Sequence, residues 1–166
     1  MKQLTDLEFT RVFDQYFKEL FNIAYGYTHD SFDAEDIVQE VFIKFYQTHK
    51  TCNDDNDKYW LIRLTINKSL DFLRKKKNAK ALTCSEYIDN HPDTYRNNDN
   101  DDIYECVNLL NKSYKTIIVF RYFNNYSVKE IARILKISES NATTRLSRAK
   151  IKLKEIIVKR RASDGR

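Results

Sequence analysis

Short polar and basic side chains gather in residues 138–148 and have the chemistry of DNA recognition. Hydroxyl and amide groups can hydrogen-bond to base edges, and guanidinium groups bind guanine and phosphate. The candidates are Ser140, Asn141, Thr143, Thr144, Arg145 and Arg148. They fall on the second of two predicted helices joined at 136–138, which is a helix-turn-helix pattern. A helical hairpin with a solvated basic face is the alternative, and it is disfavoured because the most basic part of the chain coincides with the motif.

A second group of residues interleaves aromatic and basic side chains over 58–77. Its members are Tyr59, Trp60, Arg63, Lys68, Phe72, Arg74, Lys75, Lys76 and Lys77. Such a helix can follow a phosphate backbone while aromatic rings receive unstacked bases. A single tryptophan at helical spacing is more often part of a core than a stacking platform, so Trp60 is ambiguous.

A third group is acidic and lies in the predicted helix 31–49. Asp36, Gln39, Glu40 and Ile43 share one helical face through their three- and four-residue spacing. This face is either a solvated acidic surface or a docking face for a basic protein partner. The spacing alone does not decide between the two.

Helices must position all three groups, because only two of the 166 residues are glycine and one is proline. Apolar periodicity predicts helices from Thr5 to about Gly26 and over 31–49, 58–77, 114–123, 127–135 and 138–159, with a short helix from about Asp102. Expected N-caps are Thr5, Asp30 or Ser31, Ser113, Ser127 and Ser138. Gly26 is expected to end the first helix, and residues 51–57 to form a polar loop.

The polar stretch 78–101 contains the single proline and reads as a flexible linker. The predicted fold is therefore all-α, with two small helical domains, 1–77 and 102–166, joined by that linker. Net charge alternates along the chain, at −4 over 1–50, +4 over 51–80, −5 over 81–112 and +10 over 113–166. Two basic blocks separated by an acidic one indicate two surfaces that face a polyanion.

Several classes of protein are disfavoured by composition. Two glycines exclude a phosphate loop or a dinucleotide fingerprint, and no apolar run approaches a membrane span or a signal peptide. Three widely spaced cysteines, three scattered histidines and the Asp-rich loop 53–57 match no metal, redox or catalytic pattern. We therefore expect a cytoplasmic protein that is no enzyme, inserts in no membrane and holds no metal or cofactor.

Three segments resemble the extracytoplasmic-function (ECF) sigma factors, the compact bacterial transcription initiation factors. Residues 33–42 (DAEDIVQEVF) are similar to the family's second-helix signature. Residues 60–67 (WLIRLTIN) and 71–74 (DFLR) are similar to its promoter-melting helix. Residues 114–153, with EIA at 130–132 and RLSRA at 145–149, are similar to its C-terminal DNA-binding region.

The resemblance implies partners and site residues. Core RNA polymerase would dock on Asp33, Asp36, Gln39, Glu40 and Ile43. The −10 element would meet Tyr59, Trp60, Arg63, Asn67, Arg74, Lys75 and Lys76. The −35 element would meet Ser138, Ser140, Asn141, Thr143, Thr144, Arg145 and Arg148. Members of the family often have an anti-sigma factor, which makes such a protein a further candidate partner beside promoter DNA.

Two other functions compete with this interpretation. The chain could be an autonomous helix-turn-helix regulator that binds an operator as a dimer, but residues 58–77 would then have no reason to be basic and aromatic. It could also be an enzyme that uses the C-terminal domain to find DNA, but no carboxylate cluster or activated nucleophile is recognisable.

Overall fold

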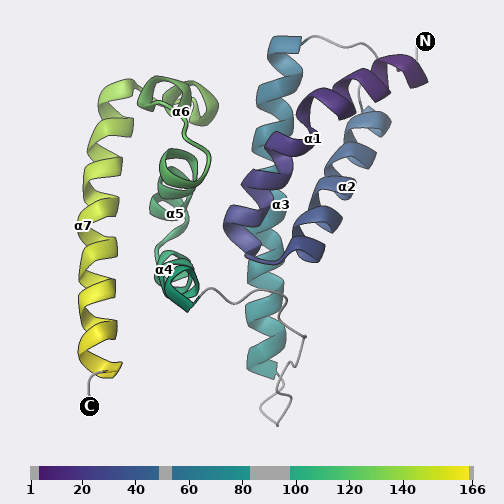
Figure 1. The fold of residues 1–166 in the computed structure, drawn as a ribbon. Coiled ribbons are helices and arrows are strands. Elements are labelled where there is room, and N and C mark those ends of the chain that lie inside the picture. Colours follow the sequence, from purple (N-terminus) through teal and green to yellow (C-terminus); the bar gives the residue numbers. More distant parts are fainter. Residues whose placement is uncertain (1–3, 49–53, 83–97, 165–166) are drawn as a thin grey trace.

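The computed structural model describes residues 4–48, 54–82 and 98–164, and all its elements in these ranges are helical (Figure 1). The elements are α1 (Asp6–Thr28), α2 (Ser31–Thr48), α3 (Asp54–Leu82), α4 (Asn98–Asn108), α5 (Lys112–Ile118), the π-helical turn η1 (Val119–Phe123), α6 (Val128–Leu135) and α7 (Glu139–Asp164). The predicted all-α class with two helical units is confirmed over these ranges. None of the described helices has an apolar stretch of 18 residues that could span a bilayer.

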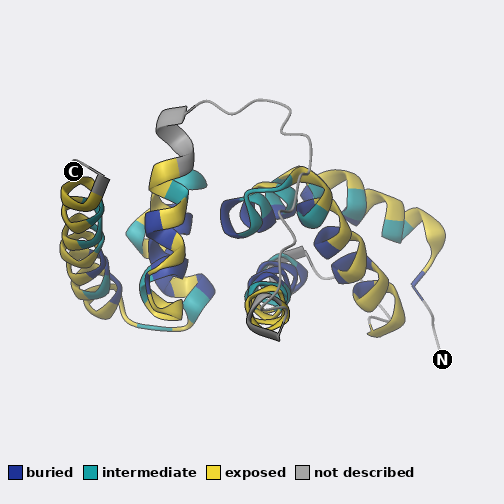
Figure 2. Ribbon diagram, turned by 90° about the horizontal axis from the view of Figure 1, so that it is seen from below, coloured by how far each residue is buried: buried dark blue, intermediate teal, exposed yellow. Residues whose placement is uncertain are grey.

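The first unit consists of α1, α2 and α3, which pack around one core. Buried side chains recur at helical spacing on each helix, for example Leu20, Phe45 and Leu61, each with no exposed surface. Figure 2 shows the buried stretches of the three helices turned toward one another. This packing fixes the exposed faces of α2 and α3, which carry two of the predicted sites.

The second unit consists of α4 to α7, and its last two helices form the predicted helix-turn-helix. Lys136 ends α6 in the left-handed conformation, with φ 55°, and the Ser138 hydroxyl accepts a hydrogen bond from the backbone N–H of Asn141 at 3.1 Å. Ala142 is fully buried where α7 packs against its neighbours. A small side chain at that position lets the two helices approach closely.

Two capping boxes define where helices begin, as the sequence predicts. Thr5 and Glu8 open α1, and Ser127 and Glu130 open α6, each with reciprocal side-chain and backbone hydrogen bonds. Of the two candidate caps for α2, Asp30 accepts a hydrogen bond from the backbone N–H of Asp33 at 2.9 Å. These caps supply partners for N–H groups that the helix itself leaves free.

Several predicted helix ends were wrong. The helix predicted over 138–159 continues to Asp164, and the one predicted over 114–123 consists of α5 and the turn η1. The helix α3 begins at Asp54 inside the predicted loop and continues five residues past Lys77 to Leu82, while α4 begins at Asn98. Acidic side chains suit a helix N-terminus, so the Asp-rich stretch opens α3 instead of forming a loop. Asn111, not Ser113, caps α5, since its side chain accepts from the Tyr114 N–H. The predicted linker residues 83–97, with Pro92, lie outside the described part of the chain.

Gly26 does not end α1, because the helix continues to Thr28 and closes at His29 in the left-handed conformation. The glycine instead lies where α1 meets the second unit. A Cβ at Gly26 would come within 2.8 Å of the Val119 Cγ1 atom, closer than real Cβ contacts allow. The absence of a side chain is thus a requirement of packing between the two units.

The contact between the two units joins α1 and α3 to α5, η1 and α6. The buried Tyr27 hydroxyl donates a hydrogen bond to Thr116 Oγ1 at 2.9 Å. The Tyr126 hydroxyl donates to the Glu19 carboxylate, which also pairs with Lys58 at 3.1 Å. We call this packing, visible in Figure 1 as the side-by-side placement of the two units, the closed arrangement.

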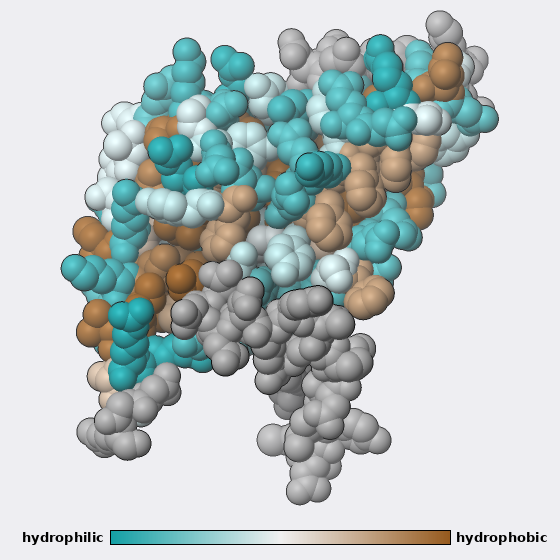
Figure 3. Space-filling model, viewed as in Figure 1, coloured by the Kyte–Doolittle hydropathy of each residue, from teal (hydrophilic) through white to brown (hydrophobic). Residues whose placement is uncertain are grey.

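Hydrophobic surface lies away from these polar contacts. Figure 3 shows one such area along α1 and another over α4 and the lower part of α7. The second coincides with a groove of about 500 Å³ lined by Ile103, Tyr104, Val107, Ile118, Tyr122, Phe123, Leu153 and Ile157, with Lys150 and Lys154 beside them. The charged surfaces described below are therefore separate from the main apolar groove.

Replacing Gly26 with Ala is expected to open the closed arrangement. The substitution favours the helical state of α1 by about 0.5–1 kcal/mol, but the new Cβ overlaps Val119. Small-angle scattering should give a larger radius of gyration than for the wild type, with unchanged helical circular dichroism. The double variant Gly26→Ala, Val119→Ala removes the opposing methyl group and should close again; an equal radius for wild type and single variant would contradict this role of Gly26.

Candidate nucleic-acid interface

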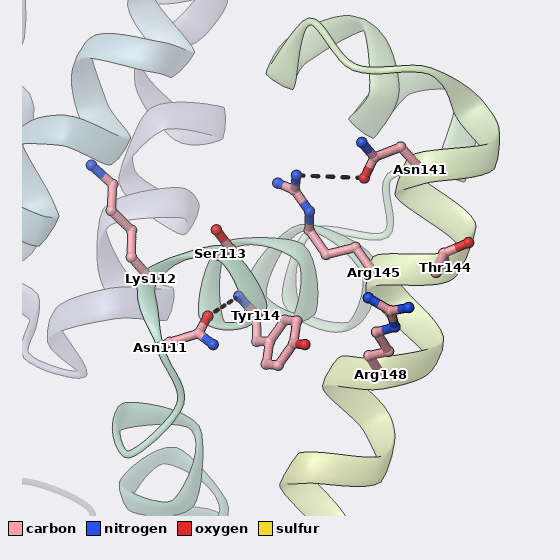
Figure 4. Close-up of a pocket in the computed structure, with 8 residues that line it drawn as sticks. All are labelled: Asn111, Lys112, Ser113, Tyr114, Asn141, Thr144, Arg145 and Arg148. Carbon is pink, nitrogen blue, oxygen red and sulfur yellow. Dashed lines mark hydrogen bonds between the residues drawn. The ribbon is translucent and has the colours of Figure 1, made fainter.

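Four of the seven residues predicted to meet duplex DNA converge on one cavity. Asn141, Thr144, Arg145 and Arg148 line a space of about 450 Å³ on α7, at the i, i+3, i+4 and i+7 positions of one helical face. In Figure 4, the side chains of Asn141 and Arg145 project toward the beginning of α5, whereas Thr144 projects away from it. The opposite wall consists of Asn111, Lys112, Ser113 and Tyr114.

The other three predicted residues lie at the beginning of α7 but do not line this cavity. The Ser138 hydroxyl serves as the helix cap, and the Thr143 hydroxyl donates to the Glu139 carbonyl at 2.9 Å. Ser140 is exposed. All three remain on the exposed side of the helix-turn-helix, since Ala142 and Leu146 hold the other side in the core.

The predicted single-strand surface runs along α3 for roughly 26 Å from Tyr59 to Lys76, at 1.5 Å per residue. Arg63 and Asn67 line a second cavity, of about 220 Å³, between α3 and the second unit. Tyr59 accepts a hydrogen bond from the Arg133 guanidinium at 3.3 Å. Trp60 is half-buried and packs against Phe45, with ring centroids 6.0 Å apart, which fits the core alternative for this side chain.

The C-terminal part of α3 presents its cations among nearby acids. Arg74 pairs with Asp71 at 3.2 Å, and Lys75 is exposed. Lys76 pairs with Asp33 of α2 at 3.2 Å, and its ammonium lies 5.7 Å from the centre of the Phe72 ring. Lys76 thus connects the basic helix to the acidic one.

The predicted docking face on α2 is assembled as the spacing requires. Asp36 and Gln39 are exposed, and Ile43 is 57% exposed although it is a large apolar residue. Glu40 pairs with Lys68 of α3 at 2.6 Å, and Asp33 with Lys76 as described. Two of the five predicted docking residues therefore already have cationic partners within the chain.

The wall that α5 contributes to the larger cavity was not predicted from the sequence. Asn111, Lys112, Ser113 and Tyr114 lie at a helix start, a place where polar residues are ordinary caps. Nothing in their spacing relates them to α7, since the two segments meet only through the tertiary fold. The +10 charge of residues 113–166 is the one sequence signal that includes them in part.

Burial shifts the pKa of three groups near the contact between the units. Burial raises the pKa of the Tyr27 hydroxyl, and the Thr116 partner offsets this only in part. Burial, together with the Glu19 carboxylate, raises the pKa of Tyr126. Burial lowers the pKa of Lys115, and the Lys77 ammonium lowers it further. Both tyrosines therefore stay protonated as donors, and a lysine of α5 lies within the positive field of α3.

In the described ranges, no three His, Cys, Asp or Glu side chains gather in a way that could hold a metal ion. The predicted site residues instead lie on helix faces that carry guanidinium, ammonium, hydroxyl and amide groups.

Both helical units match known protein-family models. Residues 12–79 match sigma-70 region 2, and residues 100–153 match sigma-70 region 4. The first match contains most of α1 and all of α2, and the second contains the helix-turn-helix. The chain is thus similar to one family in two places and in the family's own order.

Two known sigma factors are similar to this chain over nearly its whole length. The RNA polymerase sigma factor SigV of Bacillus subtilis is 30% identical, with 89% of this chain and 90% of the relative covered. The ECF RNA polymerase sigma factor SigW of the same organism is 28% identical, with 89% and 87% covered. The chain belongs to the extracytoplasmic-function (ECF) sigma factors of the sigma-70 family.

Solved structures share the fold. The sigma factor RpoE of Bartonella quintana, crystallised with the anti-sigma factor NepR, superposes with a TM-score of 0.60 at 22% identity, covering 90% of this chain and 96% of that one. CnrH, in complex with the cytosolic domain of CnrY, gives 0.66 at 19% identity, covering 92% and 89%. At these identities the likeness concerns the fold. Family membership does not favour the alternative of an autonomous regulator that binds an operator as a dimer.

Proposed function

We propose that this sigma factor directs promoter-specific initiation by dividing three binding tasks among α2, α3 and α7. The observation that carries the proposal is the combination, in one chain, of an exposed acidic face on α2 and two basic helices in the matched regions 2 and 4. In this proposal the sigma factor acts by binding and not by catalysis. It acts in the cytoplasm, where bacterial RNA polymerase transcribes.

Core polymerase is the proposed partner of the acidic face. Asp36 and Gln39 are exposed and carry the charge and the hydrogen-bonding groups, while Ile43 offers apolar surface beside them. Exposed apolar side chains rimmed by charge are typical of protein contacts. The docking partner is therefore expected to be basic, with an apolar patch that covers Ile43.

The two proposed DNA surfaces differ in chemistry. On α3, Arg63 and Asn67 flank the half-buried aromatic residues, an arrangement suited to an opened strand of the −10 element. On α7, Asn141, Arg145 and Arg148 line one exposed face, which suits base edges and phosphates in the duplex −35 element. An anti-sigma factor is a further proposed partner, by analogy with the crystallised relatives.

A direct test combines the purified chain with core RNA polymerase on a genomic template from its host. Promoter-specific transcripts that depend on added chain would support the proposal, and their start sites would supply the promoter for later assays. Neither transcripts nor core binding would overturn it. Tight operator binding by the chain alone, without polymerase, would support the autonomous regulator instead.

Reversing the charge of Asp36 to Lys is expected to weaken core binding at least tenfold, because a charged interface residue that meets a like charge typically costs more than about 1.4 kcal/mol. Asp14→Lys on α1 is the matched control, since it makes the same charge change at another exposed position. Affinity for core polymerase can be measured by fluorescence anisotropy. Equal affinities for the two variants would refute the docking assignment.

Freeing Lys76 is expected to strengthen binding to single-stranded DNA. Asp33→Asn removes the partner of Lys76, and an exposed pair contributes about 0.2–1 kcal/mol, so affinity should rise by up to about fivefold. Asp36→Asn loses the same charge without releasing Lys76 and serves as the control. A titration with a labelled oligonucleotide at low salt measures both; an equal gain in both variants would contradict a phosphate role for Lys76.

Removing Arg148 is expected to weaken promoter binding by the reconstituted holoenzyme and to lower the slope of log affinity against log salt by about 1, as for one lost phosphate contact. Lys159→Ala, on the exposed C-terminal part of the same helix, should leave that slope unchanged. Filter binding over a series of salt concentrations gives both slopes. Parallel lines for Arg148→Ala and wild type would exclude Arg148 as a phosphate contact.

A further inference from the structure

In the closed arrangement, cations of both units line two cavities that share several of their lining residues. Arg63 of α3, Lys112 of α5 and Arg145 of α7 line the cavity of about 220 Å³, together with Asn67, Ser113 and Thr116 as polar groups. The larger cavity, of about 450 Å³, shares Lys112, Ser113 and Arg145 with it and adds Arg148. We call the two cavities together the basic cleft.

No carboxylate of a described residue lines this cleft. Among the described residues that line the two cavities, none is acidic. The Arg145 guanidinium has only the Asn141 side-chain oxygen, at 3.5 Å, and Arg63, Lys112 and Arg148 form no ion pair with a described residue. In Figure 4, Arg145 projects from α7 toward the beginning of α5, Arg148 lies one turn further along α7, and the Lys112 side chain leaves the beginning of α5 in the direction away from α7.

Several cations of α3 outside the cleft have acidic partners. Lys58, Lys68 and Lys76 of α3 each pair with an acidic side chain from α1 or α2. The cations that line the cleft differ from these three lysines in having no acidic partner among the described residues. Lys115, buried beside it, has a pKa lowered by burial and by the Lys77 ammonium, which indicates that the positive field of α3 reaches α5.

Closing the two units thus brings like charges together. The closed arrangement is held by other contacts, since Tyr27 bonds to Thr116 and Gly26 admits Val119. A multivalent anion between α3, α5 and α7 would convert the repulsion into attraction on both walls. Phosphate groups fit these donors, because guanidinium groups bind them in a bidentate manner and lysine as a point charge.

We propose that the basic cleft binds a small polyphosphate anion, such as inorganic tripolyphosphate or a nucleoside triphosphate, which bridges the two units and stabilises the closed arrangement. The larger cavity alone is within the size range of small-molecule sites. The hydroxyl group of Ser113 and the amides of Asn67 and Asn141 supply further donors.

The consequence for transcription rests on the proposed function. Arg63, Asn67 and Arg145 are the residues that we assign to promoter DNA, so an anion in the cleft would compete with the promoter for them. It would also hold the −10 and −35 surfaces against each other. The ligand would therefore inhibit initiation until core polymerase separated the two units.

Isothermal titration calorimetry with inorganic tripolyphosphate, in the absence of polymerase and DNA, tests the binding itself. Wild type should bind it, and sodium sulfate at matched ionic strength should not reproduce the heat. Lys112→Gln is expected to lower the affinity about tenfold, as for one lost charge-assisted contact, whereas Lys129→Gln, an exposed lysine outside the cleft, should bind as wild type does. Equal affinities for wild type and Lys112→Gln would overturn the proposal.

A second pair of measurements tests the bridge and the source of phosphate. Tripolyphosphate should reduce the radius of gyration of the wild type, and Gly26→Ala, which opens the closed arrangement, should bind it more weakly. Binding of equal strength by Gly26→Ala would refute the bridge. A single-stranded oligonucleotide should bind both forms; if it alone binds and tripolyphosphate does not, the cleft is only part of the DNA surface and the proposal fails. Loss of promoter-specific transcription by wild type would instead concern the proposed function, since neither titration contains polymerase.

Discussion

The buried hydrogen bond between Tyr27 and Thr116 sets the relation of the two helical units, because both groups lie where water cannot replace either partner. Leaving a buried hydroxyl without a partner lowers the free energy of unfolding by about 1–3 kcal/mol. Any shift of one unit along the other would break this bond, so the bond fixes their relative position at this point. Close approach next to the bond requires a residue without Cβ at position 26. The direction in which α3 and α7 present their cations follows from this one contact.

The π-helical turn η1 is part of the same contact between the two units. The backbone N–H of Asn124 bonds to the Val119 carbonyl at 3.2 Å, five residues back, so the helix that begins at Lys112 widens at its end. This turn contains Val119, which meets Gly26, and Phe120, which is fully buried. Such turns occur mostly as single widened turns within α-helices, and here the turn carries Val119, whose side chain meets the first unit at Gly26.

The sequence predicts the parts of this fold that depend on local chemistry. Capping residues such as Thr5 and Ser127, apolar periodicity and the helix-turn-helix all come from interactions within a few residues, and each is found as predicted. The role of Gly26 could not be predicted, because its partner Val119 is distant in sequence. For the same reason, Lys112 was not associated with Arg145, although the two line the same cavities in the structure.

Charge is used in two opposed ways along α3. Toward α2 its lysines pair with Glu40 and Asp33, so the acidic face and the basic helix neutralise each other in part. Toward α5 and α7, Arg63 has no such partner among the described residues, and the basic cleft stays positive. Exposed pairs are weak, about 0.2–1 kcal/mol each, so a basic protein that covers α2 can exchange them at little cost. Such an exchange would raise the positive potential of α3 at the moment when a strand of DNA must be held. The same helix can thus respond to a protein on one side and to phosphate on the other without any change of fold.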